Sequence, residues 1–253
     1  MRLACRQGAG DQRRPAPAAC EMLESAEGIR GAMAQSVDRR PIAARDHWLA
    51  RAVATWLANR RVSPNGISIF GLVCGLIAGA AFALAVWSPG ASRALWLIGA
   101  LLVQLRLAAN MFDGMVALAR GTASPLGELY NEIPDRASDS AVLIGLGVAA
   151  GSWGLGCLAA LAAIATAYVR AVGKAAGVAS DFCGPMAKQQ RMFLVTLTAL
   201  WFGLAPASWQ QASADVGLAR IVLAVIALGA TVTAGRRLLR IAAALRRLPG
   251  PKS

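Results

Sequence analysis

Charged residues are scarce in this chain: they make up 15% of its 253 residues, and only 13 residues are acidic. An average soluble domain carries roughly 25% charged residues, so an ordinary water-soluble fold is excluded. Apolar side chains reach 57% of the composition, with a mean hydropathy of +0.51. They come in blocks of about 20, the length of a helix that crosses a hydrocarbon core about 30 Å thick. The sequence therefore predicts membrane-spanning helices.

Two further absences narrow the functional classes. The chain has five cysteines: Cys5, Cys20, Cys74, Cys157 and Cys183. None of them is in C-x-x-C spacing, so we predict neither a disulfide framework nor a zinc site. The basic residues give a formal net charge of +13, but they lack the interleaved aromatic residues of a nucleic-acid-binding face. They flank apolar blocks instead, so the expected partner is membrane phospholipid and not nucleic acid.

The pattern divides the chain into four parts. Residues 1–43 have little apolar periodicity and no signal-peptide core, and we expect them to be disordered. In residues 44–61, tryptophans and arginines alternate at helical spacing, which predicts an interfacial amphipathic helix; a juxtamembrane linker is the alternative. Residues 62–236 are expected to form an all-α domain of six membrane-spanning helices. Residues 237–253 form a basic cytoplasmic tail.

The six spans are expected at about 67–86, 95–117, 138–152, 155–172, 192–206 and 218–234. Lysine and arginine collect before the first span, between the fourth and fifth, and after the sixth, whereas the opposite loops offer little beyond Arg93 and Arg220. By the positive-inside rule, both termini are cytoplasmic, which requires an even number of spans. The sequence predicts an integral protein of a bacterial inner membrane, with the connection between the second and third spans also in the cytoplasm.

That connection and its flanking helix ends hold five of the 13 acidic residues: Asp113, Glu128, Glu132, Asp135 and Asp139. Ionisable groups at the end of a span are costly unless they pair, meet water or bind an ion, so a functional site is the first interpretation. The alternative is that these acids only balance Arg120 and Arg136, and that the nearby glycines serve helix packing.

The spacing of these residues predicts two polar helix faces. Residues at intervals of three or four share one face of the second span: Arg106, Asn110, Asp113, Gly114 and Ala117. Residues at every fourth position share one face of the third: Gly127, Asn131, Asp135 and Asp139. Two antiparallel helices joined by a short loop can turn these faces toward each other. Hard oxygen ligands gathered in this way suit Mg²⁺ or Mn²⁺ with bound phosphate.

At these positions the sequence resembles the CDP-alcohol phosphotransferase family, whose signature is D-x2-D-G-x2-A-R-x8-G-x3-D-x3-D. Asp113-Gly114-x2-Ala117 sets the register, and Gly127 and Asp135 then match without a gap. Three positions differ, because Asn110 and Asn131 replace aspartate and Leu118 replaces arginine. The resemblance extends in type over about residues 60–236 and implies six membrane helices around a site that opens to the cytoplasm.

The resemblance implies a role for each matching residue. Mg²⁺ or Mn²⁺ would be held by Asp113, Asn110, Asn131 and Asp135. The nucleotide would be bound by Asp113, Gly114, Ala117, Gly127 and Asn65, and the acceptor's proton would be taken by Asp135. The loss of two carboxylates predicts weaker metal binding or fewer ions. The acceptor or a phosphate would be bound by Arg170, Lys188, Arg191 and, deeper in the bilayer, Arg106; ordinary positive-inside charge is the alternative for the first three.

The implied reaction is attack of an acceptor hydroxyl on the β-phosphorus of a CDP-alcohol such as CDP-diacylglycerol, with release of CMP. The acceptor would be a small alcohol or a phosphorylated alcohol, which the signature does not specify. The resemblance also implies a homodimer, although nothing in the sequence itself demonstrates one. Two other functions stay open. One is a non-catalytic relative that binds nucleotide or lipid, and the other is a small transporter that uses Gln104, Arg106 and Asn110.

Overall fold

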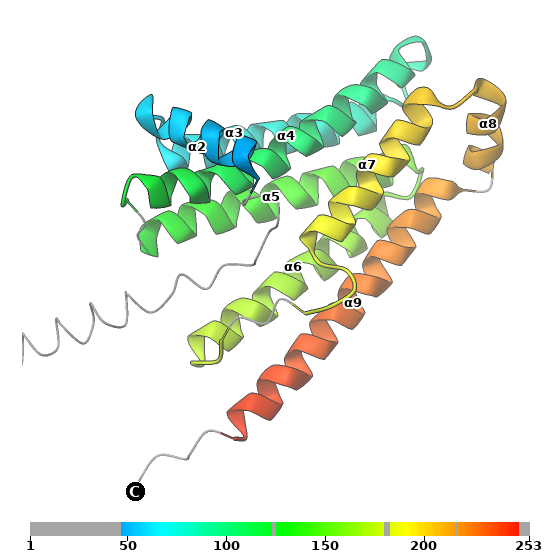
Figure 1. The fold of residues 1–253 in the computed structure, drawn as a ribbon. Coiled ribbons are helices and arrows are strands. Elements are labelled where there is room, and N and C mark those ends of the chain that lie inside the picture. Colours follow the sequence, from blue (N-terminus) through cyan, green and yellow to red (C-terminus); the bar gives the residue numbers. More distant parts are fainter. Residues whose placement is uncertain (1–46, 123–124, 180–182, 216, 248–253) are drawn as a thin grey trace, which may run out of the picture. The chain divides into compact units, whose positions relative to one another are not determined.

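The structure is a computed structural model, and it describes residues 47–122, 125–179, 183–215 and 217–247. Every regular element in these ranges is helical, which confirms the predicted all-α class (Figure 1). The elements are α2 (Trp48–Asn59), α3 (Pro64–Leu84), the 3-10 helix η2 (Pro89–Ala91), α4 (Ser92–Ala119), α5 (Pro125–Ala149), α6 (Trp153–Ala175), α7 (Lys188–Leu204), α8 (Ala207–Asp215) and α9 (Leu218–Leu245). The expectation for residues 1–43 lies outside the described residues.

Four helical segments are long and apolar enough to cross a membrane: α3, η2 with α4, α6 and α9. The chain is therefore an integral membrane protein. Helices also form at the other two predicted spans, but α7 has only 17 residues. The first half of α5 carries several charged side chains, including Glu132 and Asp135. Six spans thus remain a prediction.

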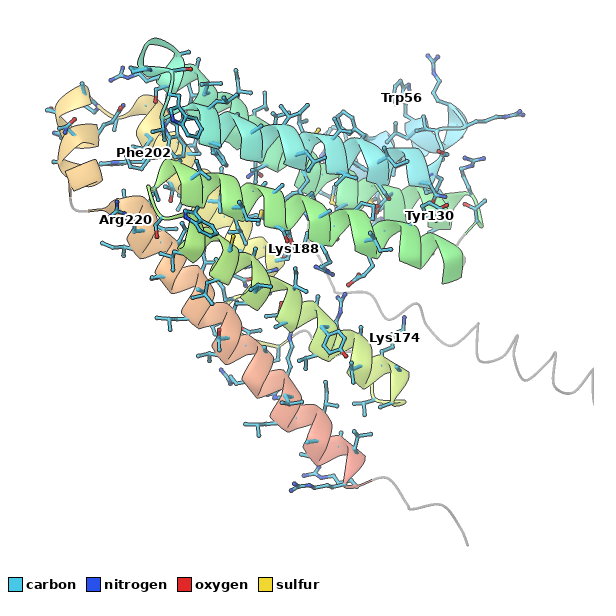
Figure 2. The ribbon with its side chains drawn as sticks, turned by 180° about the vertical axis from the view of Figure 1, so that it is seen from behind. Trp56, Tyr130, Lys174, Lys188, Phe202 and Arg220 are labelled. Atoms are coloured by element: carbon cyan, nitrogen blue, oxygen red, sulfur yellow. The ribbon has the colours of Figure 1, made fainter. Side chains whose placement is uncertain are left out.

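Large apolar side chains cover the outer faces of these helices. Leu101 of α4, Leu161 of α6 and Leu228 of α9 are each 60% or more exposed. Such a surface is unfavourable in water and suits contact with lipid tails. Figure 2 shows Phe202 and Arg220 at one end of the bundle and Tyr130 and Lys174 toward the other.

Two helices extend beyond the predicted spans. The helix α5 begins at Pro125, before the expected start of the span near 138, which agrees with the helical face predicted from Gly127 onward. The helix α9 continues to Leu245, past the expected end near 234. Polar residues in both extensions find partners inside the bundle, which stabilises helix there. In α9, buried Arg237 donates from Nε to the Cys183 carbonyl and from Nη1 to the Thr166 carbonyl, each at 3.0 Å. The short helix α8 was not predicted.

The helix α3 lies against both α4 and α5 and brings their polar faces together. It begins at a capped end, where the Ser63 hydroxyl accepts from the Gly66 N–H at 3.0 Å and Pro64 takes the first helical position. Its contact with α5 is backbone to backbone. A Cβ on Gly79 would lie 2.3 Å from the Ala141 carbonyl oxygen, and one on Gly145 would lie 2.1 Å from that of Gly79. Only glycine permits this approach.

Replacing Gly79 by Ala is expected to lower the free energy of unfolding by about 1–3 kcal/mol, because the added methyl forces two helix backbones apart. The matched control is Gly154→Ala in α6, where a Cβ meets no atom within 4 Å. Thermal unfolding of both variants in the same detergent measures the difference. Equal melting temperatures would show that the α3–α5 contact is less tight than the structure describes.

Candidate active site

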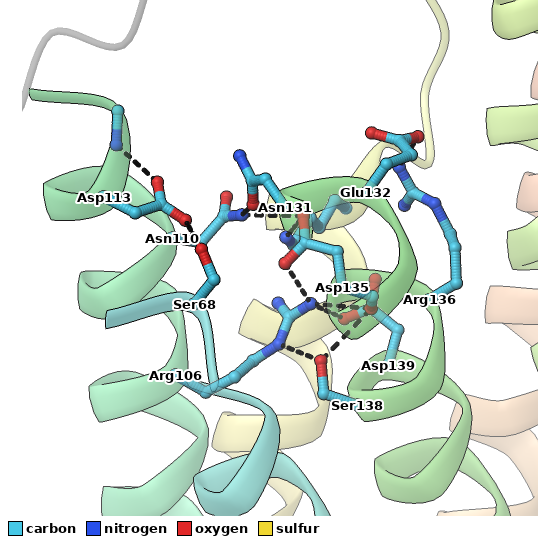
Figure 3. Close-up of polar contacts among 12 residues, drawn as sticks. Ser68, Arg106, Asn110, Asp113, Asn131, Glu132, Asp135, Arg136, Ser138 and Asp139 are labelled. Atoms are coloured by element: carbon cyan, nitrogen blue, oxygen red, sulfur yellow. Dashed lines mark hydrogen bonds and ion pairs between the residues drawn. The ribbon is translucent and has the colours of Figure 1, made fainter. Parts of the chain in front are cut away.

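Side chains from α4 and α5 meet at the polar cluster that the sequence predicts (Figure 3). From α4, Asn110 Nδ2 donates to Asn131 Oδ1 at 3.0 Å and to Asp135 Oδ2 at 2.7 Å. Asp113 lies one turn further along α4, on the same face. The structure therefore brings together all four predicted metal ligands, three of them through direct hydrogen bonds.

Asp113 is a buried carboxylate without a basic partner among the described residues. It is 3% exposed, its Oδ2 accepts from the Ser68 hydroxyl at 2.8 Å, and its Oδ1 accepts from the Gly114 N–H at 2.5 Å. Burying an unpaired charge costs several kcal/mol, so a bound cation would stabilise this position. The sequence analysis missed Ser68. No pattern within α3 marks this residue, because its partner lies 45 residues away in the chain.

Asp135 has the opposite environment, since basic groups reach both of its oxygens. Arg106 Nη2 donates to Oδ1 at 3.2 Å, and Lys188 Nζ donates to Oδ2, the oxygen that also accepts from Asn110. The side chain is 15% exposed. This carboxylate is thus held in one orientation by groups from α4 and α7.

Arg106 links α4 to α5 from a position that is 1% exposed. It forms an ion pair with Asp139 at 2.6 Å and donates to the Ser138 hydroxyl at 2.9 Å and to the Asp135 carbonyl at 3.0 Å. Most of its donors therefore serve protein acceptors. Its predicted contact with a phosphate stays a prediction, and within the described residues only Nη1 has no hydrogen-bond partner.

The predicted acceptor-binding arginine of α6 is paired with an acid of α5. Arg170 Nη2 contacts the two carboxylate oxygens of Glu132 at 2.9 and 3.1 Å, and Arg136 also donates to this carboxylate. The guanidinium groups of Arg136 and Arg170 thus both compensate the charge of Glu132. Glu132 was not among the predicted site residues, although its spacing of four from Arg136 signals a helical ion pair.

The other two predicted basic residues come from α7, and each faces an acid of α5. Lys188 contacts Asp135, as described, and Arg191 Nη2 lies 3.8 Å from Asp139 Oδ2. Arg191 is 1% exposed and donates from Nη1 to the Met186 carbonyl at 3.0 Å. The predicted basic set is therefore brought to the polar cluster.

The other predicted nucleotide-binding residues lie on α3, α4 and α5. Asn65 is exposed at the start of α3, whereas Gly114, Ala117 and Gly127 are half-buried on α4 and α5. Leu118, which replaces the signature arginine, is 54% exposed. Their assignment to the nucleotide stays a prediction.

Arg120 does not stand in for the missing arginine. Its Nη1 donates to the Val62 carbonyl at 3.0 Å and to the Arg61 carbonyl at 3.4 Å. It thereby ties the end of α4 to the α2–α3 connection.

The side chains in the cluster fit a hard divalent cation. In the described residues no three His, Cys, Asp or Glu side chains gather closely enough to hold a metal by themselves. The donors available are two carboxylates and two carboxamide oxygens, the ligand type of Mg²⁺ and Mn²⁺ and not of zinc. Mg²⁺ is commonly held by one or two carboxylates together with substrate phosphates, which matches this set.

Two curated relatives share about two thirds of the chain. A phosphatidylinositol phosphate synthase of Mycobacteroides abscessus is 29% identical over 168 residues, covering 64% of this chain and 72% of the relative. The inner membrane protein YnbA of Escherichia coli K12 is 27% identical over 164 residues, covering 64% and 79%. No protein-family model matches the sequence.

Solved structures share the fold. Phosphatidylinositol phosphate synthase of Mycobacterium tuberculosis, in complex with manganese and citrate, superposes with a TM-score of 0.63 at 20% identity, covering 79% of this chain and 90% of that one. The same synthase with CDP-DAG bound gives a TM-score of 0.60 and covers 76% and 92%. The name of the M. abscessus relative and this shared fold agree with the resemblance to the CDP-alcohol phosphotransferase family that the sequence shows. Relative to the signature of this family, its site is set apart by Asn110, Leu118 and Asn131.

Proposed function

We propose that this chain is a CDP-alcohol phosphotransferase, which moves a phosphatidyl or related phosphoalcohol group from a CDP-alcohol, such as CDP-diacylglycerol, to an acceptor hydroxyl. The observation that carries the proposal is the position of Asp135, which shares one cluster with the oxygen ligands of α4 and with basic Lys188 of α7. The name of the M. abscessus relative and the CDP-DAG bound to the M. tuberculosis synthase support this substrate class.

In the proposed reaction, the acceptor oxygen bonds to the β-phosphorus while the bond from that phosphorus to the bridging oxygen of CMP breaks. Asp135 takes the acceptor's proton, and Arg106 and Asn110 hold its carboxylate in place for this step. CMP leaves with the electron pair of the broken bond. The catalytic contribution of the chain is therefore positioning and charge stabilisation around the two phosphates.

The remaining site residues are assigned by their place around Asp135. A Mg²⁺ or Mn²⁺ ion, held by Asp113 and Asp135 with the amide oxygens of Asn110 and Asn131, would offset phosphate charge; the manganese in the M. tuberculosis synthase supports this choice. The nucleotide is assigned to Asp113, Gly114, Ala117, Gly127 and Asn65. The acceptor or its phosphate is assigned to Arg170, Lys188, Arg191 and Arg106.

The membrane placement follows from charge and surface. We assign α5 and α7 as the two remaining spans, for six in all, with both termini and the site facing the cytoplasm of a bacterial inner membrane. The name of the E. coli relative supports this membrane. Helix α2 would lie at the interface, because Trp48 and Trp56 are 69% and 56% exposed and suit the headgroup region. A homodimer and bound phospholipid stay predictions.

Metal removal tests the proposal. Purified protein supplied with CDP-diacylglycerol and a panel of small and phosphorylated alcohols is expected to release CMP with at least one acceptor. EDTA is expected to lower the rate about 100-fold or more, and excess Mg²⁺ or Mn²⁺ to restore it. CMP release is measured by chromatography. If no acceptor gives CMP in the presence of metal, the chain is a non-catalytic relative or a transporter.

A further inference from the structure

The two carboxylates of the cluster differ in what surrounds them. Asp113 is 3% exposed and receives only neutral donors within the described residues, from the Ser68 hydroxyl and the Gly114 N–H. Asp135 receives two cationic donors and an amide donor. A buried carboxylate attracts a cation in proportion to the charge left uncompensated near it. Asp113 therefore offers a carboxylate without a direct cationic contact to an ion from outside the chain, whereas protein cations already contact Asp135.

Protein donors occupy the oxygens of Asp135 that would otherwise face a cation. Asn110 presents Nδ2, a donor, to Asp135 Oδ2 at 2.7 Å and to Asn131 Oδ1 at 3.0 Å. The Lys188 ammonium donates to the same Oδ2. A second metal ion at this point would have to displace both N–H groups.

The number of negative charges in the cluster also argues against a second metal ion. The family signature places four aspartates at these positions, and four negative charges balance two divalent cations. This chain has asparagine at 110 and 131, which leaves two negative charges, and Arg106 and Lys188 already compensate the one on Asp135. The charge that remains accommodates one divalent ion and not two.

Hydrogen bonds to α9 fix the segment that precedes Lys188. The segment before it is anchored to α9, because the Met186 N–H donates to the Thr233 hydroxyl at 3.1 Å and Arg237 Nε donates to the Cys183 carbonyl at 3.0 Å. Its own side chain is only 17% exposed. The ammonium is thus presented to Asp135 by fixed backbone.

We propose that the site holds a single divalent cation at Asp113, and that the Lys188 ammonium takes the place of a second cation at Asp135. The proposal rests on the proposed function and narrows its metal site: Asp113 holds the ion, and Asp135 keeps its role as the base without being a ligand. Lys188 is here a positioning residue, acting through Asp135.

The test is the manganese stoichiometry of the full chain in nanodiscs. Free Mn²⁺ is followed by electron paramagnetic resonance during a titration, and the low-temperature spectrum of the bound ion is recorded.

Wild type is expected to bind one Mn²⁺ per chain, with the spectrum of an isolated ion. The triple variant Asn110→Asp/Asn131→Asp/Lys188→Met is expected to bind two, with the spectrum of a coupled pair. In the double variant Asn110→Asp/Asn131→Asp, which keeps the ammonium, the second ion should bind at least about tenfold more weakly than in the triple variant.

The control Lys174→Met removes an exposed ammonium near the end of α6 and should keep a stoichiometry of one. Two ions or none in wild type, one ion in the triple variant, or equal second-ion affinity in the double and triple variants would each overturn the proposal. If the triple variant does not fold, the wild-type count decides. CMP release is measured on the same samples. CMP release by wild type with two bound ions rejects the single-ion proposal and keeps the proposed function. One bound ion without CMP release keeps the single-ion proposal and rejects the proposed function.

Discussion

Asp135→Asn is expected to lower CMP release about 100-fold or more while the protein stays folded. A general base contributes typically 10²–10⁴-fold, and an amide cannot take the acceptor's proton. The fold should survive because asparagine keeps the size of the side chain and a carbonyl oxygen that can still accept from Arg106, while Arg106 retains its ion pair with Asp139. Initial rates at saturating metal, with melting temperatures of the same preparations, measure both parts.

Glu132→Gln is the matched control, since it removes a carboxylate one turn away on the same helix. Glu132 contacts Arg136 and Arg170, so its loss should act on acceptor KM and leave kcat within about tenfold of wild type. Unchanged turnover in Asp135→Asn would reject Asp135 as the base. An equal loss of kcat in both variants would show that the region tolerates no charge change, and the assignment would lose its support.

Arg106→Met is expected to destabilise the protein by about 3–5 kcal/mol, the usual cost of leaving buried charges without a partner. Arg106 is 1% exposed and contacts Asp135 and Asp139, so its removal takes the nearest cation from Asp139 and one of two cations from Asp135. Adding Asp139→Asn in the same chain should recover part of the loss, because one of the two charges then disappears. Chemical or thermal unfolding in detergent gives the free energies of unfolding of wild type, Arg106→Met and Arg106→Met/Asp139→Asn.

Arg120→Met serves as the control for Arg106. Arg120 is exposed and, among the described residues, donates to the carbonyls of Arg61 and Val62, so its loss should shift unfolding far less. The comparison also separates two roles of Arg106. If Arg106 mainly contacted a substrate phosphate, Arg106→Met would fold normally and raise KM for the CDP-alcohol. That result would contradict the structural role described here.

Much of the fold could be predicted from the sequence. Apolar blocks predicted helices at six positions, and helices form there; four are confirmed as candidate spans by length and hydropathy. The polar faces of the second and third helices were predicted from spacing alone, and Asn110 does contact Asn131 and Asp135. These features were predictable because helical periodicity is local, so residues three or four apart share a face in any fold. The catalytic and binding roles of these residues stay predictions.

Other features could not be predicted from local pattern. Arg237 looks like part of a basic tail, yet it is buried and binds carbonyls of the α6 helix and the loop before α7. Ser68 was missed because nothing in its own helix shows that α3 brings it to Asp113. Both contacts join segments far apart in the chain.

The sequence by itself determined that this is an all-helical membrane protein and which residues share the polar faces of two helices, because hydropathy and helical period depend on neighbours along the chain. Only the tertiary structure decided which charges meet. It placed Lys188 against Asp135 and left Asp113 without a cationic partner in the described part of the chain. The physical reason is that electrostatic partners are chosen by distance in space, and the packing of α3, α4, α5 and α7 sets those distances.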